Sequence, residues 1–197
     1  MRLLPIVEGD GDKIAVPLLL RRMLEERHGI FNCKILKPHV RGELPVVRRN
    51  FENWFKVAIK ENAAILWVLD FDCNDCDCVK IESDSLKERA QAIHADWPIE
   101  VAFMVKEFET LFLCDAVSTR TVLRSIPAST AFPDNAETVR GAKEWLSNAM
   151  PKGIAYKTMT HQARVSAALN LNFLAEHSPS FAHLDRALKR LLVHPQQ

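Results

Sequence analysis

No apolar run in the sequence approaches the roughly 20 residues needed to span a bilayer, so we expect no membrane segment. The apolar start at residues 3–7 is interrupted at once by acidic residues and does not look like a secretion signal. The five cysteines are an odd number, which fits a reducing interior better than a secreted disulfide scaffold. These features predict a cytoplasmic protein.

An excess of positive charge is also lacking, because the formal net charge is only +1. Proteins that bind nucleic acid through a general cationic surface usually carry a clear excess of Lys and Arg, so any nucleic-acid contact should be local. No Walker-type Gly-x-x-x-x-Gly-Lys loop and no Ser-His-Asp pattern stands out. The chain by itself is not expected to use ATP.

What the sequence does contain is an alternation of strand and helix patterns. Strands are expected at residues 2–7, 31–38, 63–69 and 99–105, with helices at about 12–28, 46–61 and 83–95. Residues 63–69 are continuously apolar, as in a parallel strand that is covered on both faces. This order predicts an α/β fold in which helices flank a central, mostly parallel sheet.

The second part of the chain has mainly helical patterns punctuated by prolines. Helices are expected near residues 108–114, 119–125, 136–149, 161–175 and 181–192. There is no internal repeat, low-complexity tract or coiled-coil heptad. We therefore expect residues 1–115 to form an α/β core and residues 116–197 to form a helical extension packed on it, within one compact unit.

Acidic residues stand at the carboxyl ends of three expected strands. Glu8 closes the first strand, Asp70 and Asp72 close the central one, and Glu107 and Glu109 follow the last. In open α/β sheets the carboxyl ends of the strands are where ligands gather, because the loops there converge. We expect these carboxylates to line one crevice.

The spacing of Asp70 and Asp72 suits a metal ion. Two residues apart in an extended chain, they project to the same side, about 6 to 7 Å apart. Carboxylates in one crevice repel each other, and a hard divalent ion such as Mg²⁺ or Mn²⁺ would relieve this repulsion. A phosphate ester on that ion would leave Glu8 free as general acid or base. The alternative is that these acids only cap helices or solvate a loop.

Further acids are secondary candidates for metal binding. Asp12 stands at a helix start, where the helix dipole alone favours an acid. Asp75 extends the acidic loop after the central strand and, like Glu107 and Glu109, could complete a second ion site. The competing role of Glu107 and Glu109 is the solvated first turn of a helix.

Cysteines and basic residues give weaker signals. Cys73, Cys76 and Cys78 have a spacing that could bind zinc, but the second paired cluster usual in structural zinc sites is absent, so incidental thiols are favoured. Lys157 stands one helical turn before His161 and could contact a phosphate. The plain alternative for both residues is the exposed start of a surface helix.

Two motifs resemble those of the toprim (topoisomerase-primase) superfamily. Residues 6–12, Ile-Val-Glu-Gly-Asp-Gly-Asp, resemble its first motif, a strand that ends in Glu-Gly with an Asp three residues beyond the Gly. Residues 69–72, Leu-Asp-Phe-Asp, resemble its second motif, the Asp-x-Asp after a buried strand. The resemblance implies a toprim-like Rossmannoid core and Mg²⁺-assisted phosphodiester chemistry, with Glu8 as the acid or base and Asp70 and Asp72 as metal ligands.

The similarity is strongest to small stand-alone prokaryotic toprim-like proteins of unknown function, related to overcoming-lysogenization-defect nucleases. It covers residues 3–192 and includes a Glu-x-Glu helix start, resembled by Lys106-Glu107-Phe108-Glu109, and a late Tyr-x-Lys-like element, to which Tyr156-Lys157 is similar. The cysteine cluster departs from the family pattern. Because relatives are encoded beside ATPases and implicated in phage defence, the resemblance implies a nuclease that acts on nucleic acid and a possible partner ATPase.

Two functions therefore stay open. The first is a Mg²⁺-dependent nuclease or related phosphodiester-processing enzyme. The alternative is a catalytically idle subunit whose acidic crevice binds a divalent ion or nucleotide and which docks a partner such as an ATPase, and the near-neutral charge favours it. The sequence favours neither DNA nor RNA, and neither a monomer nor an oligomer.

Overall fold

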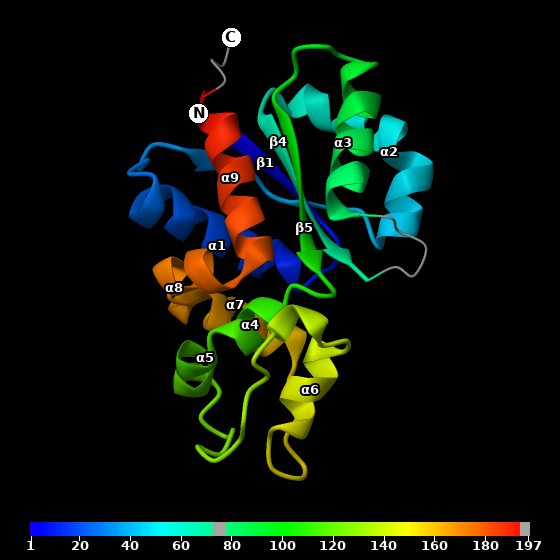
Figure 1. The fold of residues 1–197 in the computed structure, drawn as a ribbon. Helices are drawn as coiled ribbons and strands as arrows, with labels where there is room; N and C mark the ends of the chain where they lie inside the picture. Colours follow the sequence, from blue (N-terminus) through cyan, green and yellow to red (C-terminus); the bar gives the residue numbers. More distant parts are fainter. Residues whose placement is uncertain (73–77, 194–197) are drawn as a thin grey trace.

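A single parallel sheet forms the centre of the computed structural model, which describes residues 1–72 and 78–193 (Figure 1). Its strands are β1 (Arg2–Val7), β2 (Lys34–Ile35), β3 (His39–Val40), β4 (Ala64–Phe71) and β5 (Ile99–Val105). Their order is β2-β1-β4-β5, with β3 also paired to β1, and every pairing is parallel. The predicted α/β fold with a central parallel sheet is confirmed.

The apolar strand β4 lies at the middle of this sheet. Its residues from Ala64 to Leu69 are buried, as its continuous apolar run requires when both faces are covered. The register places Val7 of β1 opposite Val68, and Val105 of β5 opposite Phe71. The carboxyl ends of three neighbouring strands therefore meet at one edge of the sheet.

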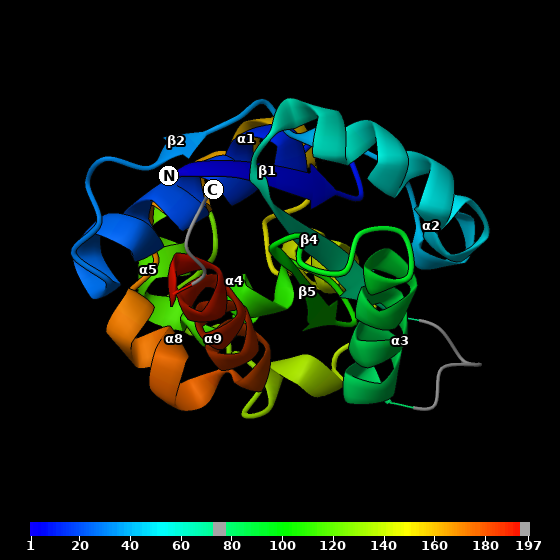
Figure 2. The same ribbon diagram turned by 90° about the horizontal axis from the view of Figure 1, so that it is seen from above.

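Helices cover both faces of the sheet (Figures 1 and 2). On one face lie α2 (Leu44–Ala58) and α3 (Val79–Gln91), and on the other lie α1 (Asp12–Arg22) and α9 (Pro179–Val193). The amphipathic pattern of α2 buries Phe51, whose ring centroid lies 5.1 Å from that of Trp67 in β4. Two separate apolar cores, one on each face, hold the sheet between the helices.

Five further helices lie beyond the carboxyl edge of the sheet (Figure 1). They are α4 (Thr110–Cys114), α5 (Ala116–Val122), α6 (Ala142–Asn148), α7 (Thr158–Ala168) and α8 (Leu171–His177). Short non-α turns occupy Met23–Arg27, Ile59–Glu61 and Ala136–Thr138. The chain then returns along β5 as α9, so the late helices lie both on a face and at the end of the sheet. None of the helices in the described part of the chain is long and apolar enough to cross a membrane.

Three expected elements are divided in the structure, and the helix expected at 83–95 lies at Val79–Gln91. The strand expected at residues 31–38 is two short strands, β2 and β3, which flank Pro38, a residue without an N–H for the ladder. The helix expected at 136–149 is interrupted before Gly141, which has a left-handed φ of 68°. The helix expected at 161–175 ends at Ala168, and a new one begins at Leu171 because the side chain of Asn170 accepts the N–H of Phe173.

Gly11 lets the start of α1 approach α7 closely. A Cβ atom at this position would collide with the side chains of Gln162 and Thr158. Gln162 is only 1% exposed, and its Nε2 donates to Asp12 Oδ1 at 2.8 Å. The turn after β1 is thereby fixed against α7.

We expect Gly11→Ala to lower the free energy of unfolding by about 1–3 kcal/mol, because the new methyl group must displace the buried side chain of Gln162 and the half-buried side chain of Thr158. Gly9→Ala is the matched control, since a Cβ there meets only Asp12 Oδ2 at 3.5 Å, an ordinary contact. Urea unfolding followed by circular dichroism measures both variants. Equal stabilities of the two variants would contradict the close packing of α1 on α7.

Candidate functional site at the carboxyl edge of the sheet

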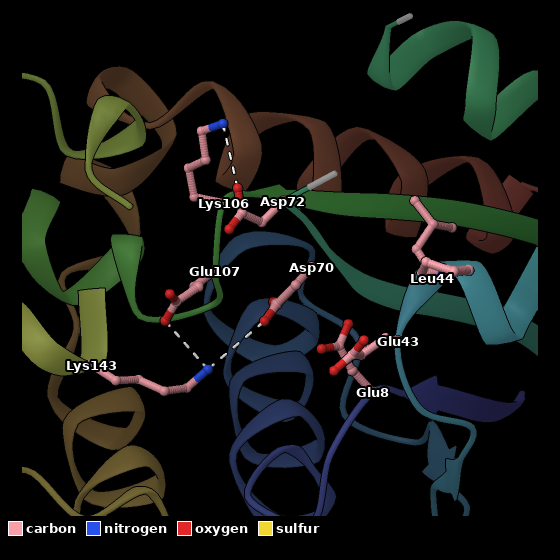
Figure 3. A pocket seen from close by; sticks show the side chains of 9 residues that line it. Glu8, Glu43, Leu44, Asp70, Asp72, Lys106, Glu107 and Lys143 are labelled. Atoms are coloured by element: carbon pink, nitrogen blue, oxygen red, sulfur yellow. Dashed lines mark ion pairs between the residues drawn. The ribbon is translucent and has the colours of Figure 1, made fainter. Parts of the chain in front are cut away.

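A polar pocket of about 310 Å³ opens at the edge where β1, β4 and β5 end (Figure 3). It is lined by Glu8, Glu43, Leu44, Pro45, Asp70, Asp72, Lys106, Glu107 and Lys143. A second cavity of about 300 Å³ shares Glu8, Asp70 and Lys143, and reaches the start of α7. The three strand ends predicted to carry the site thus contribute to one crevice.

The ammonium group of Lys143 lies among three carboxylates, and Figure 3 shows two of them, Asp70 and Glu107. Its Nζ is 3.3 Å from Glu107 Oε2, 3.5 Å from Glu109 Oε2 and 3.9 Å from Asp70 Oδ2. Burial opposes its charged form, yet the three acids together raise the pKa of Lys143 above its usual value. A lysine from α6 therefore carries the positive charge at the centre of the crevice.

Asp70 is held rigidly at the end of β4. Its Oδ1 accepts the backbone N–H of Phe108 at 2.9 Å, and its side chain is 18% exposed. Its own backbone N–H hydrogen-bonds to the carboxylate of Glu8. Burial raises the pKa of Asp70 well above the usual range, and the charge of Glu8 raises it further.

Glu8 has a carboxyl group that titrates near neutrality. Burial raises its pKa to about 7, and the charges of Asp12 and Glu43 act in the same direction. The N–H of Asp70 and the charge of Lys143 oppose this rise. Glu43 precedes α2, and Figure 3 shows its carboxylate beside that of Glu8. Glu8 can therefore both accept and release a proton at ordinary pH.

Glu109 is fully buried behind the pocket. The hydroxyl of Tyr156 donates to Glu109 Oε1 at 3.1 Å, and burial raises the pKa of Glu109 to about 7. Burial and the neighbouring Glu109 also raise the pKa of Tyr156, so its hydroxyl stays protonated and remains a donor. One oxygen of Glu109 is fixed by Tyr156 and the other faces Lys143.

Asp12 helps to shape the turn after β1. Its Oδ2 accepts the N–H of Gly9 at 2.9 Å, in addition to the bond from Gln162 to its Oδ1. Burial raises the pKa of Asp12, and both hydrogen bonds partly counter this. Asp12 lines the second cavity and acts electrostatically on Glu8, so its structural and electrostatic roles coexist.

Asp72 lies at the rim of the pocket and pairs with different cations from those that face Asp70. Its Oδ1 is 3.1 Å from Arg140 Nη2 and 3.6 Å from Lys106 Nζ. Lys106 has a left-handed backbone with a φ of 66°, which is uncommon for a residue with a side chain. That turn directs the chain away from β5 and brings Glu107 into the pocket.

A family model for a domain of unknown function, DUF4276, matches residues 7–189. The chain belongs to this family. No curated protein matches it significantly. Among solved structures, the C-terminal region of the Burkholderia pseudomallei OLD protein is similar over 97% of this chain and 96% of that one, with 16% identity and a TM-score of 0.46. The match agrees with the expected family of unknown function, whereas the toprim assignment stays a prediction.

Some predicted site residues of this DUF4276 protein either fall outside the described part of the chain or line neither cavity. Asp75, Cys73 and Cys76 lie outside the described residues, and Cys78 is exposed with a free thiol. Lys157 is exposed and lines neither of the two cavities, and its N–H donates to His161 Nδ1 at 2.9 Å.

Sequence reasoning missed Lys143, Glu43 and Gln162. Lys143 and Gln162 lie on helices far along the chain, and nothing local distinguishes them from other polar helix residues. Glu43 offered one signal, because it stands directly before the Leu-Pro that begins α2, close to the end of β3. Tyr156 and Lys106 were noted only as parts of motifs.

The carboxylate oxygens of this DUF4276 crevice are of the type that a hard divalent ion takes as ligands. The buried Oε2 atoms of Glu107 and Glu109 have no hydrogen-bond partner among the described residues, and carboxylate oxygens are the ligands that Mg²⁺ prefers. No three Asp, Glu, His or Cys side chains in the described ranges already stand as ligands of one ion. Lys143 lies between the acids that would bind such an ion.

The raised pKa values predict a falling stability with rising pH when no divalent ion is present. Glu8 and Glu109 have pKa values of about 7 in the folded chain, against an ordinary value of 4.5. The folded state thus holds protons that the unfolded state has released. The stabilisation is complete below about pH 4.5 and is lost as the pH rises towards 7 and beyond.

Glu8→Gln should reduce the loss of stability between pH 5 and pH 8 by about 2–3 kcal/mol, because the amide has no charge to bury. Glu176→Gln, the same change at an exposed position, should keep the wild-type slope. Urea unfolding in EDTA across this pH range makes the comparison. An unchanged slope in Glu8→Gln would exclude Glu8 as a group with a raised pKa.

Proposed function

We propose that this DUF4276 protein is a nuclease, or a related phosphodiester-processing enzyme, that uses Mg²⁺ or Mn²⁺. The observation that carries the proposal is the position of Glu8, which has a pKa of about 7 and accepts a hydrogen bond from Asp70 at the adjoining strand end. A proton-transfer group beside fixed carboxylates is what metal-assisted hydrolysis of a phosphodiester requires.

The residues of the crevice have distinct roles in the proposed reaction. Glu8 takes a proton from the attacking water or gives one to the leaving oxygen. Asp70 and Asp72 would hold the metal ion, with Glu107 and Glu109 as further oxygen donors and Asp12 as a neighbouring acid. The bound ion would supply charge neutralisation for the phosphate and a more acidic water. Lys106 and Lys143 line the pocket and add positive charge that a phosphate can meet.

The charge of the crevice supports a requirement for the ion. Acids outnumber lysines among the residues that line the pocket. Phosphates of a nucleic acid would be repelled from such a pocket until a divalent ion changes its charge. The net charge of only +1 offers no general attraction that could replace the ion. Chelation of divalent ions should therefore abolish both binding and cleavage at this site.

The positions of the two motifs support a toprim-like core. The Glu-Gly motif follows β1, the Asp-x-Asp motif closes β4, and these two strands are paired in parallel. The motifs therefore lie side by side, as a shared site needs. Through the same resemblance, the proposal extends to a cytoplasmic role in phage defence with a partner ATPase.

A catalytically idle binding subunit is the second candidate. The observation that favours it is the contact of Lys143 with Asp70, Glu107 and Glu109, which balances part of the acidic charge without any metal. Such a crevice is stable without turnover. Its ligand would be a divalent ion or a nucleotide, and its activity would belong to the partner.

We expect the pure protein to cleave at least one of four labelled substrates, single-stranded or duplex DNA or RNA, in Mg²⁺ or Mn²⁺. Glu8→Gln and Asp70→Asn should each slow cleavage by about 100-fold or more, because proton transfer and metal binding are lost. Glu176→Gln should cleave at the wild-type rate, and EDTA should stop all cleavage.

Cleavage that survives both site substitutions would mean that another site or a contaminant is responsible. No cleavage of any substrate by the wild-type chain would favour the idle binding subunit. Circular dichroism of each variant establishes that the fold is retained, since both changes are nearly isosteric.

A further inference from the structure

The acids of the crevice fall into two groups. Glu8, Asp70 and Asp72 belong to the ends of β1 and β4, whereas Glu107 and Glu109 follow β5. Many phosphodiester-cleaving sites hold two divalent ions about 3.5–4 Å apart, and two groups of acids would suit such a pair. In this chain, however, the second group already faces the ammonium group of Lys143.

We propose that Lys143 permanently takes the place of a second divalent ion, so that the crevice binds one ion, next to Glu8 and Asp70. The inference rests on the proposed function, since it concerns how many ions that site uses. It assigns to Lys143 the role of a built-in counter-cation and positioning residue.

The contacts of Lys143 support this assignment. Its Nζ lies 3.3 Å from Glu107 Oε2, 3.5 Å from Glu109 Oε2 and 3.9 Å from Asp70 Oδ2. An ammonium group is a compact charge with three donors, so it can serve three acids at once. Asp70 then connects the two groups, because its Oδ2 lies near Lys143 Nζ and its backbone N–H donates to the carboxylate of Glu8.

A second observation concerns Glu109. Its side chain is 0% exposed, and its Oε2 has no hydrogen-bond partner among the described residues. Tyr156 holds the other oxygen, so Glu109 Oε2 remains directed at the space that Lys143 occupies. A buried carboxylate oxygen of this kind needs a cation. Lys143 is the cation that the described residues provide.

Lys143 is also within reach of a substrate. Its side chain is 38% exposed and lines both cavities of the crevice. The ammonium group can therefore meet a phosphate oxygen, as the second ion would, but it cannot bind and acidify a water molecule. A single divalent ion next to Glu8 would have to bind and acidify the water.

Counting bound Mn²⁺ tests the inference on the full chain without any cleavage. Electron paramagnetic resonance of free Mn²⁺, or titration calorimetry, gives the number of ions and their affinity. The wild-type chain and Lys143→Arg should each bind one ion. Lys143→Met, which has similar length but no charge, should bind a second ion or bind Mn²⁺ at least 10-fold more tightly.

Several results would overturn the inference. They are two ions in the wild-type chain, no ion in any of the three proteins, and the same number and affinity of ions in Lys143→Met as in the wild type. The inference would also be overturned if Lys143→Arg bound the same number of ions, with the same affinity, as Lys143→Met, because the positive charge would then be irrelevant.

Lys143→Met leaves buried acids without a partner, so its stability needs a separate measurement. Its melting temperature should rise more with added Mn²⁺ than that of the wild type, because the ion replaces the lost charge. An equal rise in both proteins counts against the inference. If Lys143→Met does not fold even with Mn²⁺, the test rests on the number of ions bound by the wild type and by Lys143→Arg. One bound ion supports the inference, and two bound ions overturn it.

These outcomes are separate from those of the cleavage assay. A chain that binds one Mn²⁺ and cleaves nothing would contradict the nuclease proposal while agreeing with the role of Lys143. A chain whose cleavage depends on Glu8 but which binds two ions would support the nuclease proposal and contradict the role of Lys143.

Discussion

The ion pairing of Lys143 with Asp70, Glu107 and Glu109 is the interaction on which the arrangement of this protein depends. Parallel strands bring their carboxyl ends together, and acidic residues at those ends would repel each other in a place partly removed from water. The helices beyond the edge of the sheet supply the opposing charge from α6 (Figure 1). Their position at that edge, away from either face of the sheet, thus has an electrostatic reason as well as an apolar one.

The last helix fixes the place from which Glu107 enters the pocket. Ser180 of α9 accepts the backbone N–H of Val105 at 3.0 Å, at the end of β5. Arg190, further along α9, pairs with Glu100 at the start of the same strand, with N–O distances of 2.6 and 2.8 Å. Both ends of β5 are therefore attached to one helix. The left-handed turn at Lys106 starts from a strand that cannot easily shift, and this rigidity carries through to the acids that follow it.

Much of the sheet could be predicted from the sequence, because its signals are local. The strands at residues 2–7 and 99–105 have the predicted bounds, and the apolar run of β4 indicated a central strand. Acids after parallel strands could be expected to meet for the same reason. Lys143 could not be found in this way, because its partners lie far back in the sequence and its own helix has no distinctive pattern. The helix breaks before Gly141 and at Asn170 likewise depend on backbone conformation and capping bonds that composition alone does not specify.

The order in which the parts of the crevice occur along the chain has a consequence for its synthesis. The acids of β1, β4 and the turn after β5 leave the ribosome before α6 and α7, which bring Lys143 and Gln162. A nascent chain therefore carries an acidic sheet edge whose internal cation has not yet been made. The crevice gains the positive charge of Lys143 only when the late helices dock, so an incompletely translated product would have the strands of this fold without that cation among its acids.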